Sequence, residues 1–222
     1  MSEVDRRTLL GATAAMLSAS AAAQAVPPFT PKPLGFDPAK VPGLSERLLT
    51  SHHQNNYGGA VRRLGQIVQA FAALDPATAP GFQLNGLKRE ELLAWNSMIL
   101  HELYFAGLGQ PSAPDARLAQ AIERDFGSFD RWRAEFVGLG KALGGGSGWV
   151  LLTWSARDRR LVNQWAADHT MTLAGATPIL ALDMYEHAYH IDFGANAGAY
   201  VEAFMKALDW REAARLYQTV SG

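Results

Sequence analysis

The sequence predicts an α+β protein, with an N-terminal long antiparallel helical hairpin and a C-terminal domain holding a small three-stranded antiparallel sheet flanked by helices. In the first half, apolar residues recur at helical spacing over two long stretches joined by one loop. In the second half, three short apolar runs lie between glycine-rich and polar turns, which is typical of strands. Hydrophobic residues make up 48% of the 222 residues, enough for a substantial core.

The N-terminus predicts an export signal that is cleaved after Ala25. Arg6 and Arg7 precede an uncharged, alanine-rich run from Gly11 to Ala23, and the ending Ala-Gln-Ala suits a signal peptidase. This run is too short to span a bilayer, which needs about 20 residues. The paired arginines favour the twin-arginine route to the periplasm, with no membrane attachment after cleavage. We expect four segments: the signal at 1–25, an extended Pro-rich segment at 26–43, the hairpin domain at 44–112 and the α+β domain at 113–222.

Two long helices form the predicted hairpin. The first runs from Leu44 to about Leu74, with Gly58 and Gly59 as an interruption. A loop from residue 75 to residue 81 follows, and the second helix extends from about Arg89 to Gly107. Two helices joined by one short loop favour an antiparallel pair.

Shorter elements make up the second half. A short helix at 118–126 is followed by one that Ser128 caps and that runs to about Leu143. A glycine-rich run then leads into three predicted strands, and two helices end the chain. The strands are expected at 149–154, 161–166 and 177–182, and the terminal helices at 197–208 and 209–219.

Composition excludes several function classes. The formal net charge is −1, whereas a nucleic-acid binder usually carries a basic excess or stripe. The absence of cysteine rules out disulfides, iron–sulfur clusters and thiolate chemistry. We therefore expect neither a nucleic-acid partner nor a cysteine-based site.

The histidines predict one metal site. The strongest local motif is Asp183-x-x-x-His187, because residues four apart point the same way if the chain becomes helical after the third strand. His52 and His101, one on each arm of the hairpin, can complete a set of three histidines and one aspartate. Such a set suits iron or manganese, and also zinc. The six histidines are His52, His53, His101, His169, His187 and His190; His53, one residue along from His52, is expected to be structural.

The predicted ligand set favours redox chemistry on a small anion. Three neutral imidazoles and one carboxylate leave a metal site whose overall charge stays positive, which attracts anions. Zinc hydrolases use similar ligands, but usually with a nearby glutamate base, as in His-Glu-x-x-His. That pattern is absent here.

Two longer motifs accompany these histidines: Asp183-Met-Tyr-Glu-His-Ala-Tyr189 and Gly146-Ser-Gly-Trp149. With them the chain resembles the iron/manganese superoxide dismutases; the first motif is highly specific for this family and the second moderately so. The order and spacing of the motifs agree over roughly Leu44 to Tyr217. Further matching pieces are His52-His53, His101-Glu-Leu-Tyr-Phe, Phe126-Gly-Ser-Phe-Asp and Asp209-Trp210.

The resemblance implies a superoxide dismutase that holds one iron or manganese ion per subunit, without choosing between the two metals. It implies that His169 hydrogen-bonds metal-bound solvent and that Trp149 walls the pocket. It also implies a homodimer in which Glu186 bonds His187 of the neighbouring subunit, with a tetramer as the alternative. The ligands that it implies are His52, His101, Asp183 and His187.

The chain departs from the family in the outer part of the predicted site. Ala60 stands where the family has a gateway tyrosine, and Asn56 replaces the histidine that bonds that tyrosine. We expect Tyr57 to supply a hydroxyl in place of that of the gateway tyrosine. Other departures are Tyr185 for tryptophan, His190 for a tyrosine that bonds across the dimer to the position of Asn56, and Ala197 for an anion-guiding arginine. The alternatives are an oxidase or peroxidase-like protein of the same fold, or one without turnover.

Overall fold

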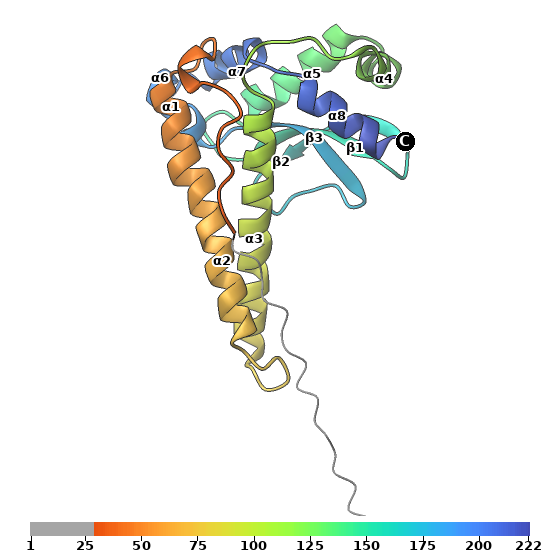
Figure 1. Cartoon of the computed structure of the whole chain (residues 1–222). Coiled ribbons are helices and arrows are strands. Elements are labelled where there is room, and N and C mark those ends of the chain that lie inside the picture. Colours follow the sequence, from red (N-terminus) through yellow and green to blue (C-terminus); the bar gives the residue numbers. More distant parts are fainter. Residues whose placement is uncertain (1–28) are drawn as a thin grey trace, which may run out of the picture.

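A computed structural model describes residues 29–222 of the chain. The predicted export signal at 1–25 lies outside the described residues. A long helical hairpin precedes a compact group of shorter helices and a small sheet (Figure 1). Within residues 29–222, no helix has both the length and the apolar character needed to cross a membrane.

The hairpin consists of two arms that lie side by side. The first arm is built from α1 (Glu46–Ser51), the π-helix η2 (His52–Tyr57) and α2 (Gly58–Ala72), and the second is α3 (Gly81–Ala106). The prediction that the second helix starts at Arg89 was wrong by two turns. Gly81 is the first residue of the helix and Pro80 is its N-cap, where proline is tolerated because the first amide groups have no helical partner.

The π-helix changes which residues of the first arm face inward. The amide of Gly58 bonds the carbonyl of His53, five residues back, so one extra residue is accommodated in the turn. His52 and Tyr57, five residues apart, are both buried, at 1% exposure each. The predicted interruption therefore takes the form of a wider turn directly before Gly58, and the helix continues through both glycines.

The C-terminal part holds the predicted three-stranded antiparallel sheet, in the order β2-β1-β3. Its strands are β1 (Trp149–Ser155), β2 (Arg160–Ala166) and β3 (Ala176–Asp183). The central strand β1 is buried along its whole length. Trp149 pairs with Asp183, so the first residue of β1 and the last of β3 lie at the same end of the sheet. This end faces the hairpin.

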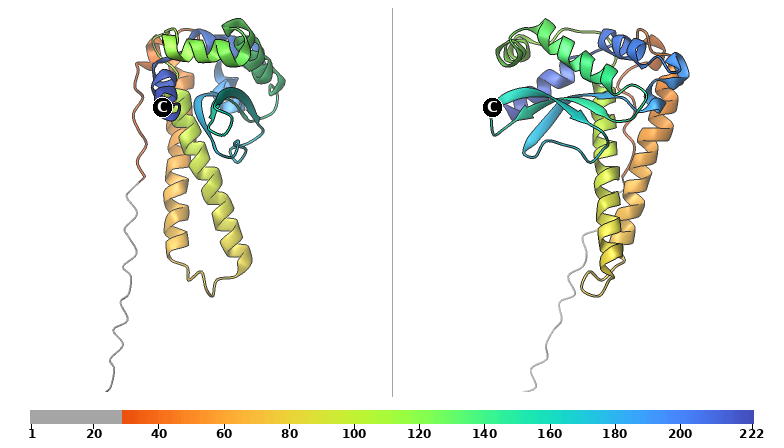
Figure 2. Two further views of the ribbon diagram at one scale, coloured as in Figure 1. Left: turned by 90° about the vertical axis from the view of Figure 1, so that its right-hand side faces the viewer. Right: turned by 180° about the vertical axis from the view of Figure 1, so that it is seen from behind.

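Helices cover the sheet and connect it to the hairpin. The elements are α4 (Ala116–Phe126), α5 (Phe129–Ala142), α7 (Ala197–Lys206) and α8 (Arg211–Val220), with short turns η1 (Pro38–Lys40), η3 (Glu186–Ala188) and α6 (His190–Phe193). Ser128 caps α5 as predicted, accepting from the amide of Arg131. Both α3 and α8 pack on β3, and the sheet lies beside the end of the hairpin away from its loop (Figure 2). The α+β fold is confirmed.

Gly148 allows β1 to start close to its neighbours. Its φ of 134° is in the region that favours glycine, and an added Cβ would lie 2.1 Å from the carbonyl oxygen of Ala166. The carbonyl of Gly148 also accepts from the amide of Met184, at 2.9 Å. Because Gly148 has no Cβ, the start of β1 can lie against the end of β2. Its carbonyl also bonds the residue that follows β3.

Candidate metal centre

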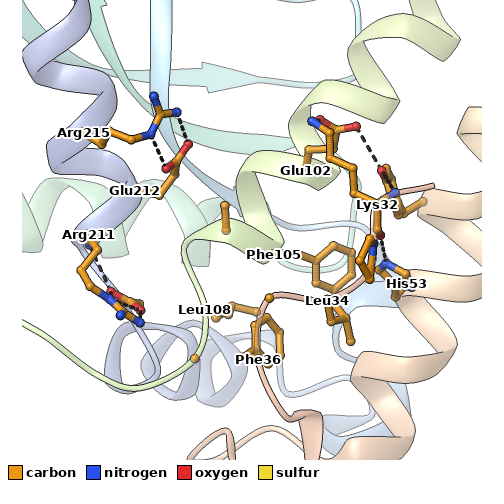
Figure 3. A pocket seen from close by; sticks show the side chains of 16 residues that line it. Lys32, Leu34, Phe36, His53, Glu102, Phe105, Leu108, Arg211, Glu212 and Arg215 are labelled. Carbon is orange, nitrogen blue, oxygen red and sulfur yellow. Dashed lines mark hydrogen bonds and ion pairs between the residues drawn. The ribbon is translucent and has the colours of Figure 1, made fainter. Parts of the chain in front are cut away.

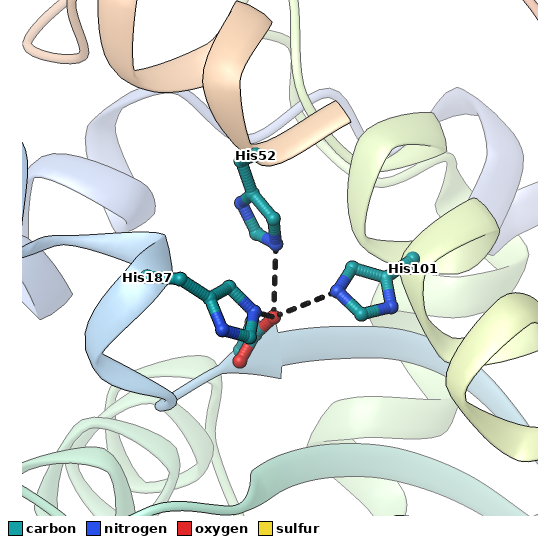
Figure 4. Close-up of side chains that lie close together, drawn as sticks. His52, His101 and His187 are labelled. Atoms are coloured by element: carbon teal, nitrogen blue, oxygen red, sulfur yellow. Dashed lines mark hydrogen bonds and ion pairs between the residues drawn. The ribbon is translucent and has the colours of Figure 1, made fainter. Parts of the chain in front are cut away.

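Four side chains from distant parts of the sequence meet at one point. The potential ligand atoms of His52, His101, Asp183 and His187 all lie within 4.8 Å of one another. Asp183 Oδ2 is 3.0 Å from His52 Nε2, 3.3 Å from His187 Nε2 and 3.4 Å from His101 Nε2. The three rings come from η2, α3 and η3 and point at one carboxylate oxygen (Figure 4). The four predicted ligands thus lie together.

The orientation of His101 shows that this cluster fits a cation. Its Nδ1 lies 2.6 Å from the carbonyl oxygen of Ser97, and only a protonated nitrogen can donate to a carbonyl. In the neutral ring Nε2 then carries a lone pair. That atom is buried and has no hydrogen-bond partner among residues 29–222, and it faces the Asp183 carboxylate. Two electron-rich atoms aimed at each other in a dry site are stabilised by a cation between them.

The chain after β3 brings Asp183 and His187 together in an unexpected way. Asp183 is the last residue of β3 and His187 lies in the 3₁₀ turn η3, so the chain between them is a short 3₁₀ turn and not an α-helix. The amide of Tyr185 donates to Asp183 Oδ1 at 2.9 Å. This bond turns the chain sharply and leaves Oδ2 to face the imidazoles.

Burial sets the protonation states of the cluster. Loss of solvation lowers the pKa of His101 to about 3 and also lowers the pKa of His52. Burial would raise the pKa of Asp183, but its hydrogen bonds with His187 and His52 outweigh that effect and hold the pKa below its usual value. Near neutral pH, His52 and His101 are therefore neutral and Asp183 is ionised, as metal ligands must be.

His169 and Trp149 lie beside the cluster and are bonded to each other. Trp149 is fully buried, and its Nε1 donates to His169 Nδ1 at 3.0 Å. Because an indole nitrogen can only donate, Nδ1 of His169 is unprotonated, and the proton of the neutral ring is on Nε2. The ring of His169 stacks on Tyr185, with centroids 4.8 Å apart, and lines one cavity with His101 and His187.

Tyr57 lies in a different cavity from the one that a proton relay to the histidine cluster would need. Its hydroxyl accepts from the amide of Lys32 at 2.8 Å and donates to Glu102 Oε1 at 3.0 Å. Tyr57 lines a separate cavity of about 450 Å³ between the N-terminal segment, α3 and α8, seen in Figure 3 with the Lys32–Glu102 pair and the adjacent His53. The expectation that Tyr57 supplies a hydroxyl near the metal is corrected, because the π-helix turns this ring to the other cavity.

Other residues singled out from the sequence take varied places. His53 bonds the carbonyl of Lys32 at 2.8 Å and lines the same cavity as Tyr57. Asn56 and Ala60 line the same cavity as His101 and His187, whereas His190 is exposed at the start of α6. Sequence reasoning missed Ser97, whose backbone orients His101. Its position four residues before His101 on a predicted helix was the available signal.

Comparisons with known proteins agree with this geometry. Residues 114–216 match the family model of iron/manganese superoxide dismutases, C-terminal domain. The chain is 67% identical over 183 residues to an iron superoxide dismutase from Cupriavidus metallidurans. The aligned region covers 82% of this chain and 93% of the relative. The chain belongs to the iron/manganese superoxide dismutase family.

Relatives named as manganese superoxide dismutases and relatives named as iron superoxide dismutases are both similar to the chain. A manganese superoxide dismutase of Halobacterium salinarum is 34% identical over 185 residues, covering 82% of this chain and 90% of the relative. An iron superoxide dismutase of Aquifex pyrophilus is 31% identical over 181 residues, covering 78% of this chain and 84% of the relative. The resemblance seen in the motifs is thus confirmed over most of the chain.

Proposed function

We propose that the chain is a metal-dependent superoxide dismutase in which His52, His101, Asp183 and His187 hold one iron or manganese ion per subunit. The observation that carries the proposal is the buried lone pair of His101 Nε2, directed at an ionised carboxylate without a proton between them. When bound, iron or manganese supplies a one-electron couple, by which one superoxide is oxidised to oxygen and a second is reduced to peroxide.

The residues of the chain prepare the site for this reaction. Trp149, Tyr104 and Phe105 exclude bulk water, since each lies buried against a cluster histidine. Peroxide needs two protons per turnover, which come from solvent. His169 carries its proton on Nε2 and lines the cavity; its role is to donate a hydrogen bond to the oxygen species there. Trp149 holds it in that tautomer.

Metal content and superoxide consumption test the function together. The purified protein should contain close to one iron or manganese per chain and consume superoxide rapidly. Asp183→Ala should lose most of the metal and the activity, whereas Asp130→Ala, which removes an exposed carboxylate on α5, should keep both. A metallated protein that leaves superoxide intact but oxidises a phenolic dye would favour the oxidase or peroxidase-like alternative.

We further propose a homodimer in which Glu186 bonds His187 of the second subunit. Within residues 29–222, His187 Nδ1 has no hydrogen-bond partner, and its side chain is 26% exposed. Glu186 is exposed on the same turn. Metal-bound histidines usually donate their second nitrogen to a carboxylate or carbonyl, so a partner's Glu186 would complete the arrangement.

Export by the twin-arginine route is also proposed, on the strength of Arg6, Arg7 and the uncharged run that follows them. In a Gram-negative bacterial host the protein should appear in the periplasm, cleaved after Ala25. Replacing both arginines by lysine should retain it, uncleaved, in the cytoplasm. Equal periplasmic yields from both forms would contradict this route.

A further inference from the structure

One charged side chain lines the cavity that reaches the histidine cluster. This cavity has a volume of about 410 Å³ and is bounded by α2 and α3, with His101, His169 and His187 in its lining. Among its lining residues, Arg63 alone carries a permanent charge. Asn56 and Ala60, which precede Arg63 on the same arm and also line the cavity, are neutral.

The guanidinium of Arg63 remains accessible to an anion. Its side chain is 61% exposed, and its Nη2 bonds Glu90 of α3, whose side chain is 31% exposed. Glu90 also lies 3.5 Å from Arg89, so two guanidinium groups share this carboxylate. An exposed ion pair of this kind is weak, and the hydrogen bond occupies one of the five N–H donors of Arg63.

We infer that Arg63 attracts the anionic substrate into the metal cavity and that Glu90 limits its attraction. This inference rests on the proposed function and adds a residue that governs substrate capture. Superoxide is a small monoanion, and a cation in the lining of a cavity raises the local concentration and the entry rate of such an anion. Arg63 acts on encounter and is not a catalytic residue.

The main test compares Arg63→Ala with Arg62→Ala on the same helix. Arg62 is exposed but does not line the cavity, and the two variants have the same net charge. At low ionic strength, Arg63→Ala should lower kcat/KM for superoxide by about three- to tenfold. Arg62→Ala should remain within about twofold of wild type. Near 1 M salt, where the screening length is about 3 Å, the loss should disappear.

Two further variants test the sign of the effect. Arg63→Lys should recover most of kcat/KM, and Glu90→Gln should raise it by about two- to threefold at low salt, because it removes an opposing negative charge. The affinity for azide, a small monoanion used as a probe on the metal-loaded protein, should follow the same order. Metal content and circular dichroism should be unchanged in all variants.

The outcomes separate this inference from the proposed function. If Arg63→Ala and Arg62→Ala match each other in kcat/KM and azide affinity at every salt concentration, the role of Arg63 is wrong while the dismutase function stands. If the fully metallated wild type does not consume superoxide, the proposed function is wrong. The azide affinities then still decide whether Arg63 attracts anions to the cavity.

Discussion

The protonation of a single ring decides what the cluster can bind. His101 lies on α3, and its Nδ1 donates to the carbonyl of Ser97, one turn earlier on the same helix. The helix thereby selects the tautomer that presents a lone pair to Asp183. The sequence indicated His101 as a ligand through its motif, but tautomers depend on contacts that only the folded chain defines.

Burial of His101 predicts how the metal-free protein responds to acid. The pKa of His101 is about 3 in the folded state and about 6.5 in an unfolded chain. The unfolded state therefore binds more protons below pH 6.5, so the stability of the folded state falls as the pH drops from about 6.5 toward 3. At pH 5 the loss from this residue should be about 2 kcal/mol.

Urea unfolding of the metal-free protein at pH 7.5 and pH 5 measures this loss. His101→Gln, which removes the titrating group and keeps a polar side chain, should show a smaller difference between the two pH values. The opposite sign, with greater stability at pH 5, would mean that His101 is protonated in the folded metal-free protein.

At the scale of the elements, the π-helix η2 separates two environments. It directs His52 to the cluster and Tyr57 to a bond with Glu102. Tyr57→Phe leaves Glu102 and the amide of Lys32 without this partner, so the free energy of unfolding should fall by about 1 kcal/mol, as measured in urea. Metal content should not change. A tenfold loss of kcat with unchanged stability would instead place Tyr57 in a proton path.

Gly148 makes a second prediction for the elements. Gly148→Ala would place a methyl group 2.1 Å from the Ala166 carbonyl and force an alanine into a φ of 134°. The backbone must then shift, and the free energy of unfolding should fall by about 3 kcal/mol or more. Trp149 follows directly, so its bond with His169 should weaken and activity should decline.

The matched control lies two residues earlier in the same glycine-rich run. A Cβ added to Gly146 would meet only the Leu143 carbonyl, at 3.5 Å, which is ordinary contact. Gly146→Ala should therefore change the free energy of unfolding by less than about 0.5 kcal/mol. Thermal unfolding of both variants checks the pair, and equal destabilisation would show that the close approach of Gly148 to Ala166 is not the cause of the loss.

The elements also show where sequence reasoning reaches its limit. The spacing of apolar residues and the turn residues predicted the hairpin and the three strands, because these depend on local pattern. The histidine motifs predicted that His52, His101, Asp183 and His187 would meet, as they do. The start of α3 at Gly81 and the π-helix were not predictable from period alone. Tyr57 was misplaced for that reason, since one extra residue in a turn redirects a side chain by a large angle.

At the scale of the whole molecule, the cluster joins the two halves of the chain. His52 and His101 come from the hairpin, and Asp183 and His187 from the C-terminal part. A ligand that binds only the folded state stabilises it. Because the metal would bind both halves, its removal should lower the thermal midpoint of the whole protein in a single transition. Two separated transitions in the metal-free protein would show that the halves unfold independently.

Assembly provides the last prediction at this scale. In a twofold-symmetric dimer, a Glu186–His187 bond would occur twice. Truncating one partner of a desolvated charge-assisted pair costs about 2 kcal/mol or more. Glu186→Ala should therefore raise the dimer dissociation constant by about a thousandfold, since two bonds are lost and 1.4 kcal/mol corresponds to a factor of ten.

Sedimentation velocity over a range of concentrations measures this change. Glu123→Ala on α4, which removes another exposed glutamate, should leave the dissociation constant within about twofold of wild type. Because His187 also belongs to the predicted ligand set, monomeric Glu186→Ala should hold its metal less tightly than the wild-type dimer. A wild type that sediments as a monomer at high concentration would contradict the dimer, and a Glu186→Ala protein as dimeric as wild type would place the interface elsewhere.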